Sequence, residues 1–357
     1  MYDLKELRKE TPYYIYDLQV IRKQIITILN AFSKYAKFNL YYSIKANNCK
    51  EILEEISKFN IGVSVSSMEE YNAANDVGFK NISYTAPMIT PEVLELAKEN
   101  KIKINLNNAS ELNNKLTNIG LRINPKIGWS YLKDHAAASE DSQFGVPLEE
   151  VSQLDLSKIS RLHMHTSSDS YEIALFIRAL KKILNIAKDY PNITEINIGG
   201  GIGTPIDEGV SEFNMELFAS KIIQIIEQFN KTYARELILN FEPGSYIVRA
   251  AGNYVCKIIS LDKKQGKLFY FTDGTKHHLH GLATIGKIQF ITNSKQKKLA
   301  KLVGRTCQRS DILLEQELPI LHRGDFVIIK YAGAYCEVAA NQFHALKLPK
   351  NYFINLT

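Results

Sequence analysis

Residues 40–59 read LYYSIKANNCKEILEEISKF, and this stretch contains one complete strand-and-helix unit of the kind that decides the fold. The apolar run Leu40–Ile44 is followed, after a few polar residues, by apolar side chains at helical spacing in Cys49–Phe59. The same alternation continues through the first two-thirds of the chain. The further apolar runs are Gly62–Val65, Ile82–Tyr84, Ile102–Leu106, Gly120–Ile123, Leu162–His165, Ile196–Ile198 and Leu237–Phe241, with longer helical patterns at Ser170–Tyr190 and Glu212–Phe229.

Eight strand runs that alternate with helices predict an α/β fold, a closed parallel (β/α)8 TIM-type barrel over residues 25–245. The length of this span is typical of such barrels. A doubly wound open sheet is the alternative, which the eight repeats and the lack of an early GxGxxG turn disfavour. Pro125–Gly145 has no clear periodicity, so we expect a long mobile loop there, and loops of that length are usually functional or disordered.

The last hundred residues have a different pattern, in which strand-like runs follow one another with few helices between them. They predict a C-terminal β-rich domain, of β-barrel type, which Thr11–Asp17 (TPYYIYD) is expected to join as a crossing strand. We therefore assign residues 25–245 to the barrel and residues 1–24 with 246–357 to the β-rich domain. The predicted strands are Tyr254–Leu261, Lys267–Thr272, Lys287–Thr292, Lys301–Val303 and Asp325–Lys330.

Composition narrows the classes of function. The chain has 357 residues, 45% of them hydrophobic, which is typical of a globular protein of about two domains. Its net charge of +6 is spread along the chain, so we expect no nucleic-acid partner and only mild attraction of anionic ligands. No stretch approaches the ~18 apolar residues of a membrane span. The charged first residues, MYDLKELR, do not resemble a signal peptide.

The four cysteines, Cys49, Cys256, Cys307 and Cys336, are far apart in the sequence. They form neither a metal-type pair nor a disulfide framework, so we expect no metal and a reduced, cytoplasmic protein.

Four segments that end predicted strands carry residues suited to chemistry. Lys45 directly follows the first strand, where such barrels place their active sites, and a desolvated lysine can form a Schiff base; a surface lysine is the alternative. Glu242, in Phe241-Glu242-Pro243-Gly244, ends the eighth strand, where the alternative is a simple turn. The glycines of residues 199–203 expose backbone N–H groups that suit phosphate, unless they form only a flexible turn.

The fourth segment, Leu162–Ser168, carries two histidines. Strand alternation places His163 and His165 on one face, where either ring can stack on a ligand or transfer protons. The alternative for each is a buried core histidine with its polar atoms satisfied. No carboxylate or cysteine nearby supports a metal site.

Together these motifs resemble the fold-type III pyridoxal-phosphate-dependent decarboxylases, the group of the diaminopimelate, ornithine and carboxynorspermidine decarboxylases. The resemblance covers nearly the whole chain in the right order. It implies a barrel of the alanine racemase type that binds pyridoxal 5′-phosphate, an amino-acid substrate, and decarboxylation of its α-carboxylate. Further matches are the end of an active-site loop at Asp141–Gly145 and, in the β-rich domain, Asp273, Gly304–Cys307, Asp311 and Gly333–Tyr335.

The resemblance also implies residue roles. Lys45 would form the Schiff base with the cofactor, His165 would stack on its pyridine ring, and Glu242 would pair with the pyridinium nitrogen. Cys307 would return a proton to Cα, and in this family the cysteine comes from the partner subunit, which implies a homodimer with shared active sites. The other implied cofactor-binding residues are Ser168, Gly199, Gly200, Gly201, Gly244, Ser245 and Tyr335, and the implied substrate-binding residues are Arg122, Asp273, Gln308, Arg309 and Asp311.

Departures from the family pattern bear on the substrate. Ser245 replaces the common arginine of Glu-Pro-Gly-Arg, and Ser64 stands where ornithine decarboxylases carry aspartate. Gln308 stands where enzymes of free diamino acids place a carboxylate to hold the distal ammonium, and Arg309 follows it. Because an unpaired buried ammonium is costly, we interpret the distal amine as acylated, with an anionic acyl group. Family members of this kind act on citryl-diamino acids such as N-citryl-ornithine in siderophore assembly, and on carrier-bound glutamyl groups in antibiotic assembly.

Other functions stay open at this point. If Gln308 is merely tolerated, or if Asp273 or Asp311 holds a free amine, the substrate is diaminopimelate, ornithine, lysine or carboxynorspermidine. A racemase of the same architecture would use Tyr335 as a second base opposite Lys45. A barrel that stores the cofactor without turnover is disfavoured, because such proteins resemble the barrel alone.

Overall fold

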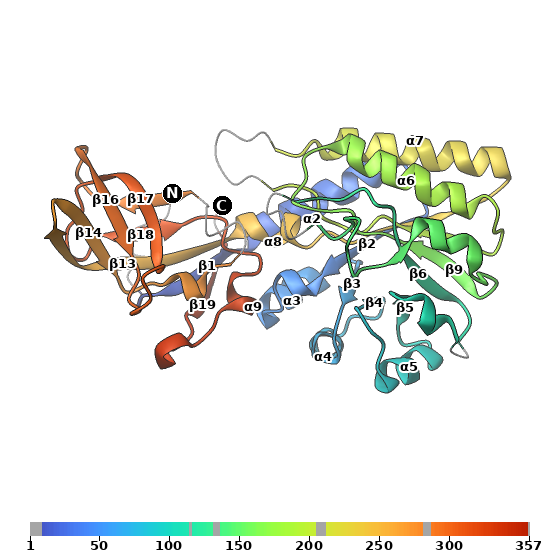
Figure 1. Ribbon diagram of the computed structural model, residues 1–357, viewed down its shortest axis with the longest axis horizontal. Helices are drawn as coiled ribbons and strands as arrows, with labels where there is room; N and C mark the ends of the chain where they lie inside the picture. Colours follow the sequence, from blue (N-terminus) through green and yellow to red (C-terminus); the bar gives the residue numbers. More distant parts are fainter. Residues whose placement is uncertain (1–8, 114–115, 131–135, 205–211, 281–286, 356–357) are drawn as a thin grey trace. The chain divides into compact units, whose positions relative to one another are not determined.

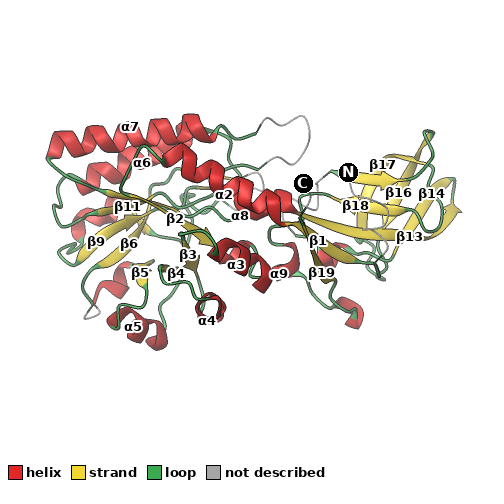
Figure 2. Cartoon of the chain, turned by 180° about the vertical axis from the view of Figure 1, so that it is seen from behind, coloured by secondary structure: helices red, strands yellow, loops and turns green. Residues whose placement is uncertain are grey.

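The computed structural model describes residues 9–113, 116–130, 136–204, 212–280 and 287–355. Two compact units make up this structure. One consists of Arg22–Thr204 and Glu212–Ile247, and the other contains the described residues up to Ile21 and from Val248 onward. Figure 2 shows that the two units differ in secondary structure. Helices surround the strands of the first unit, whereas the second consists mainly of strands.

The first unit is a closed barrel of eight parallel strands, as the sequence predicted. Each strand pairs with the next in chain order, β12 pairs with β2, and the β5–β6 pairing completes the ring. Every predicted run forms a strand. The barrel strands are β2 (Phe38–Ser43), β3 (Gly62–Val65), β4 (Ile82–Thr85), β5 (Lys103–Leu106), β6 (Ile119–Asn124), β9 (Ile159–His163), β11 (Glu195–Asn197) and β12 (Ile238–Phe241).

Helices lie between most of these strands. The three predicted from periodicity are present as α3 (Lys50–Ser57), α6 (Ile173–Ala187) and α7 (Met215–Tyr233), and α6 and α7 run side by side (Figure 1). The ends differ from the predicted ranges because local contacts set them. The Asn214 side chain accepts the Leu217 N–H and starts α7 there. The other helices of this unit are α2 (Leu18–Phe32), α4 (Met68–Val77), α5 (Pro91–Lys98), and the 3-10 helices η1 (Ile44–Ala46), η2 (Ala109–Asn113) and η4 (Leu148–Gln153).

The long segment after β6 contains little regular structure. The short strand β7 (Trp129–Ser130) pairs with β10 (Ser167–Ser168), and β8 (Val146–Pro147) pairs with β6. Residues 131–135 of the predicted loop lie outside the described residues.

The second unit is built around a mixed, mostly antiparallel sheet in the order β15-β18-β13-β14-β16-β17. The N-terminal strand β1 (Tyr13–Asp17) pairs with β13, so the predicted crossing strand does join this sheet. Two strands that the sequence analysis missed are β17 and β19. The strands of this unit are β13 (Gly252–Lys264), β14 (Lys267–Thr272), β15 (Ile288–Ile291), β16 (Lys297–Val303), β17 (Ile312–Pro319), β18 (Phe326–Ile329) and β19 (Lys350–Ile354), with the short helices α8 (Ser245–Val248), η5 (Arg249–Ala251), η6 (Lys276–His278), α9 (Cys336–Ala339) and η8 (Phe343–Ala345) in and beside the sheet.

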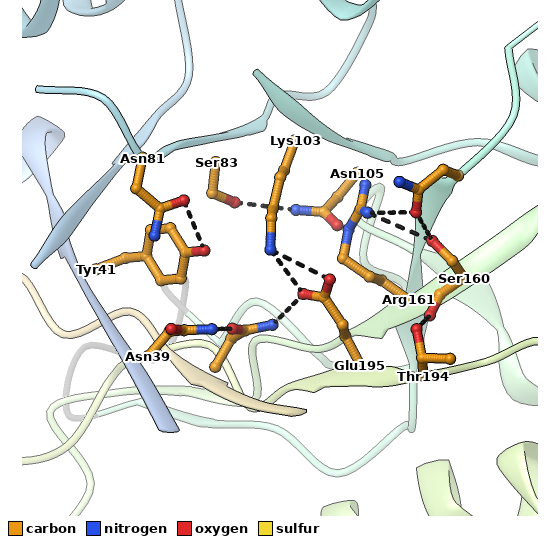
Figure 3. Close-up of polar contacts among 12 residues, drawn as sticks. Asn39, Tyr41, Asn81, Ser83, Lys103, Asn105, Ser160, Arg161, Thr194 and Glu195 are labelled. Atoms are coloured by element: carbon orange, nitrogen blue, oxygen red, sulfur yellow. Dashed lines mark hydrogen bonds and ion pairs between the residues drawn. The ribbon is translucent and has the colours of Figure 1, made fainter. Parts of the chain in front are cut away.

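Polar side chains occupy much of the barrel interior, where bulky apolar residues are usual (Figure 3). Near the first residues of the strands, Glu195 accepts Lys103 Nζ at 3.1 and 3.2 Å and Asn240 Nδ2 at 2.9 Å. Asn240 in turn accepts a hydrogen bond from Asn39. Because Glu195 is only 7% exposed, these donors are what make its burial tolerable.

Among the described residues, no helix is both long and apolar enough to cross a membrane.

The pair between Lys103 and the buried Glu195 predicts the effect of Lys103→Met. This substitution should destabilise the barrel by on the order of 3 kcal/mol, because Glu195 would stay buried and lose its cation. Urea unfolding followed by circular dichroism measures this change. The matched control is Lys37→Met, since Lys37 pairs with Glu236, which is 80% exposed, and should cost at most about 1 kcal/mol. Equal effects of the two substitutions would show that burial does not strengthen the Lys103 pair.

Candidate active site

Lys45 follows β2 at the carboxyl end of the barrel. Its side chain is exposed in η1, while its neighbours Ile44 and Ala46 are buried. The end of β2 is tied to the end of β12, because Ser43 Oγ donates to the Glu242 carbonyl at 2.8 Å. The sequence places a lysine here, and the folded chain presents its amine beside the last strand of the barrel.

Glu242 is a buried carboxylate that three side chains contact. His163 Nε2 lies 3.0 Å from Oε2, while Ser83 Oγ and Asn197 Nδ2 donate to Oε1 at 2.9 and 2.8 Å. Burial by itself raises the pKa of Glu242, but the contacts with His163 and Asn197 and the charge of Lys45 outweigh it and lower the pKa to about 2. The carboxylate is therefore ionised at neutral pH and can bind a protonated ring nitrogen.

The two histidines lie at the carboxyl end of β9, and the charges of Lys45, Arg122 and Glu242 act on both rings. β9 ends at His163, which is buried in the barrel, and His165 lies beyond the strand and is partly exposed. Gly200 N–H donates to His165 Nδ1 at 3.3 Å. Burial, together with the charges of Lys45 and Arg122, keeps the pKa of His165 well below its usual value. A neutral ring of this kind can stack against an aromatic ligand.

The glycines after β11 are required by close packing. A Cβ at Gly199, which has φ +66°, would lie 2.3 Å from the Met164 carbonyl oxygen, and one at Gly201 would lie 1.8 Å from the Ser167 carbonyl oxygen. Gly199 N–H donates to Asn197 Oδ1 at 2.8 Å. The loop is thus packed against the segment that contains Ser168, and side chains there would displace it. Its shape suits an anion that approaches the backbone closely.

Arg122 projects from β6 at the same end of the barrel. Its guanidinium lies 4.8 Å above the Phe144 ring, which brings the predicted loop segment Asp141–Gly145 back to the barrel. Burial lowers the pKa of Arg122 to about 10, and the charge of Glu242 opposes that shift. The arginine stays charged at neutral pH and is available to a carboxylate.

Apart from Gly244 and Ser245, the remaining predicted residues belong to the β-rich unit. Asp311 is buried, and its carboxylate accepts hydrogen bonds from Lys276 N–H, Thr275 Oγ1, and both the N–H and Oγ1 of Thr306. Asp273 accepts Thr11 Oγ1 at 2.5 Å and Lys257 N–H at 2.9 Å. Both carboxylates therefore already have donors from the protein itself.

The segment between Thr306 and Asp311 is exposed. Cys307 is a free, exposed thiol, Arg309 is exposed, and Gln308 Oε1 lies 2.6 Å from His277 Nε2. Tyr335 is partly buried with φ +65° and precedes α9. Gly244 packs against Ala46 and Ser43, and Ser245 begins α8.

Sequence reasoning missed the residues that surround Glu242. Ser83 and Asn197 were not singled out, and His163 was open between a core residue and a ligand-binding one. The available signal was a polar residue within an apolar strand run. It was too weak to use alone, because the partner of each such residue lies on another strand.

The barrel residues fit pyridoxal phosphate. The site supplies an exposed lysine amine, an ionised carboxylate for a ring nitrogen, a neutral imidazole and a glycine loop for the phosphate. No group of three or more histidine, cysteine, aspartate or glutamate residues in the described part of the chain could hold a metal ion.

Comparison with known proteins agrees with this chemistry. Residues 18–249 match the family model described as "Pyridoxal-dependent decarboxylase, pyridoxal binding domain". A diaminopimelate decarboxylase of Bacteroides thetaiotaomicron is 25% identical over 96% of this chain and 95% of its own. A 2-[(L-alanin-3-ylcarbamoyl)methyl]-2-hydroxybutanedioate decarboxylase of Staphylococcus aureus is 26% identical over 97% and 94%.

A solved structure also shares the fold. Diaminopimelate decarboxylase from Helicobacter pylori, complexed with L-lysine, aligns with a TM-score of 0.88 at 24% identity, over 99% of this chain and 94% of that one. The chain belongs to the pyridoxal-dependent decarboxylases and is a pyridoxal-phosphate-dependent amino-acid decarboxylase, a carboxy-lyase.

Proposed function

We propose that Lys45, His165 and Glu242 form the catalytic end of the barrel. The observation that carries this assignment is the ionised, buried Glu242 carboxylate, whose pKa the charge of Lys45 helps to lower. Lys45 binds the cofactor covalently through its amine, His165 packs its neutral ring on the face of the cofactor, and Glu242 accepts the ring N–H. When bound, pyridoxal phosphate supplies an electron sink for the electron pair left by loss of CO₂.

The other residues at this end of the barrel hold the cofactor phosphate and orient the substrate. The loop of Gly199, Gly200 and Gly201 lets the phosphate approach the backbone closely, and the N–H groups of Gly199 and Gly200 hold the loop in place by donating to Asn197 and His165. Ser168, Gly244, Ser245 and Tyr335 are further proposed cofactor contacts. Arg122, a partly buried cation at this end of the barrel, binds a substrate carboxylate. Cys307, an exposed thiol, donates the proton that replaces CO₂ at Cα.

Lys45→Ala should abolish the yellow absorbance of lysine-bound cofactor and reduce turnover below detection, because no other amine replaces it. Absorbance spectra of the purified enzyme and CO₂ release measure both effects. The control Lys50→Ala alters an exposed lysine of α3 and should change neither. A lysine adduct that borohydride still reduces in Lys45→Ala would refute the assignment.

We propose further that the substrate is a diamino acid whose distal amine is acylated. Gln308 Oε1 is 2.6 Å from His277 Nε2, and the His277 ring is stacked on Phe343 with centroids 4.5 Å apart. With its oxygen engaged by the His277 N–H, the Gln308 amide presents its NH₂ group outward. An NH₂ group donates, so it suits a carbonyl or carboxylate oxygen and repels an ammonium, which only donates.

Neighbouring charges support the same substrate. Arg309 is exposed beside Gln308, and its planar fork suits the carboxylates of a citryl group. The carboxylates of Asp273 and Asp311 already accept protein donors, so we propose that they shape this segment rather than hold a free amine. The Staphylococcus aureus relative is named for a substrate in which an alanine side chain is joined through a carbamoyl group to a hydroxybutanedioate. We therefore propose a role in siderophore biosynthesis, with N-citryl-ornithine or a similar conjugate as substrate.

The wild-type enzyme should prefer N-citryl-ornithine over free ornithine, lysine or diaminopimelate by on the order of a hundredfold in kcat/KM, measured by CO₂ release. Gln308→Glu combined with Arg309→Ser should lower this ratio, because a carboxylate replaces the amide donor and the cation is lost. The matched control, Gln316→Glu with Arg323→Ser, makes the same charge changes at exposed positions elsewhere and should keep the ratio.

Comparable kcat/KM for diaminopimelate and the conjugate would instead support diaminopimelate decarboxylation. That is the second candidate, because the Bacteroides thetaiotaomicron relative has that activity in its name.

We also propose a cytoplasmic homodimer in which Cys307 of one subunit completes the barrel site of the other. The support is the family resemblance of the Cys307 segment and the exposure of Cys307.

Mixing Lys45→Ala with Cys307→Ala should restore up to about a quarter of wild-type activity, because half of randomly exchanged dimers are mixed and each carries one intact site. Steady-state turnover after subunit exchange measures the recovery. Mixing Lys45→Ala with Glu242→Gln is the control, since both changes lie in the barrel and no mixed dimer has an intact site. Absence of recovery with exchange verified would place each site within one chain.

A further inference from the structure

We propose that His163 is a positioning residue for the cofactor: its neutral ring donates Nε2–H to Glu242 Oε2 and fixes the carboxylate so that it faces the ring nitrogen. This inference rests on the proposed contact between Glu242 and that nitrogen. It assigns a role to a histidine that sequence reasoning left open between a core residue and a ligand-binding one.

The first support is the division of donors between the two oxygens of Glu242. Oε1 accepts two protein donors, Ser83 Oγ at 2.9 Å and Asn197 Nδ2 at 2.8 Å, whereas Oε2 accepts His163 at 3.0 Å. A carboxylate oxygen has two lone-pair positions. Oε1 is therefore fully used by Ser83 and Asn197, and Oε2 keeps one position for the N–H of a bound ring.

The second support is the tautomer of His163. Its Nδ1 is buried and has no hydrogen-bond partner among the described residues. A buried N–H without an acceptor costs more than a buried acceptor left unused, and the ionised Glu242 requires a donor. Both facts place the proton on Nε2 and leave the ring neutral.

The third support is the link from Glu242 to the glycine loop. Asn197 donates to Glu242 through Nδ2 and accepts the Gly199 N–H through Oδ1, both at 2.8 Å. The same loop reaches His165, because Gly200 N–H donates to His165 Nδ1. The carboxylate held by His163 is thus joined, through one buried amide, to the glycine loop that we propose for the phosphate.

The charges around His163 agree with a neutral ring. Burial lowers the pKa of His163, the nearby Glu242 opposes this shift, and the cations Arg122 and Lys45 add to it. His165, the other titratable ring at this end of the barrel, is also kept neutral, with its pKa lowered by burial. Loss of the His163 donor would leave Glu242 buried with fewer donors, and its pKa would rise from about 2.

The test compares His163→Leu, which removes the donor, with His163→Gln, which retains an N–H. Apoenzyme titrated with pyridoxal phosphate gives the dissociation constant, and the absorbance of the bound cofactor is recorded against pH. We expect His163→Leu to weaken cofactor binding about tenfold and its spectrum to titrate at a pH at least about one unit higher than in the wild type. His163→Gln should restore both properties. The direction follows because protonated Glu242 no longer accepts the ring N–H.

One further variant, Glu242→Gln, separates failure of the proposed function from failure of the His163 role. Glu242→Gln should lower kcat roughly a hundredfold; if it does not, the proposed function fails. If Glu242→Gln has this effect but His163→Leu binds the cofactor and titrates as the wild type does, the role of His163 alone is overturned.

A purely structural role is also distinguishable. His278→Leu, a change at a buried histidine of the β-rich unit, controls for destabilisation and should leave the pH dependence of the spectrum unchanged. If it shifts that dependence as His163→Leu does, the proposal is wrong. Should His163→Leu not fold, His163→Asn, which is too short to reach Glu242, replaces it with the same expected shift.

Discussion

The buried carboxylate of Glu242 must be satisfied by donors, and that requirement constrains the rest of the barrel. A carboxylate left unpaired at 5% exposure would cost several kcal/mol or take up a proton. Its donors come from three strands, Ser83 on β4, His163 on β9 and Asn197 on β11. β9 and β11 are close to β12 in the ring, but β4 reaches it only because the ring is closed. The ionised state at the catalytic end therefore depends on barrel closure.

The same requirement explains why the interior is polar. Asn105 donates hydrogen bonds to the hydroxyl groups of Ser83 and Thr85, and Figure 3 shows its contact with Ser83. The Ser83 hydroxyl in turn donates to Glu242, so Asn105 positions one of the donors of that carboxylate. A Cβ at Gly120 would lie 1.9 Å from Asn105 Oδ1, so glycine on β6 leaves space for that amide. Polar contacts extend from there to the opposite end, where Lys103 and Asn240 satisfy Glu195. The polar interior therefore has two roles: it positions the Glu242 carboxylate, and it stabilises the barrel by satisfying Glu195.

In the β-rich unit another buried carboxylate has a comparable role. Asp311 accepts donors from Thr275, Lys276 and Thr306, and so joins the two segments that carry His277 and Gln308. The His277 ring, stacked on Phe343, then faces the Gln308 amide. Substrate selection in our proposal thus depends on which end of the Gln308 amide contacts His277. A free NH₂ group favours an acylated distal amine, whereas a free carbonyl would favour an ammonium group.

Much of the fold was determined by the sequence itself. Each barrel strand is a short apolar run, and the local hydrophobic pattern is enough to predict that such a run is buried. The strands β17 and β19 were missed because exposed, charged or partly buried positions interrupt their apolar pattern. The helix ends shifted because a single capping side chain such as Asn214 sets them.

The site divides in the same way. Lys45, Glu242 and the glycines of residues 199–201 were predictable because each lies in a short motif at the end of a strand. The contacts of Glu242 with Ser83, His163 and Asn197 were not, since these residues are 159, 79 and 45 positions away from it. Likewise, the sequence alone could not show that the Asp311 carboxylate accepts hydrogen bonds from Thr275, Lys276 and Thr306. Local pattern determines which residues end the strands, whereas hydrogen-bond partners across a closed barrel depend on register and closure, which only the tertiary structure decides.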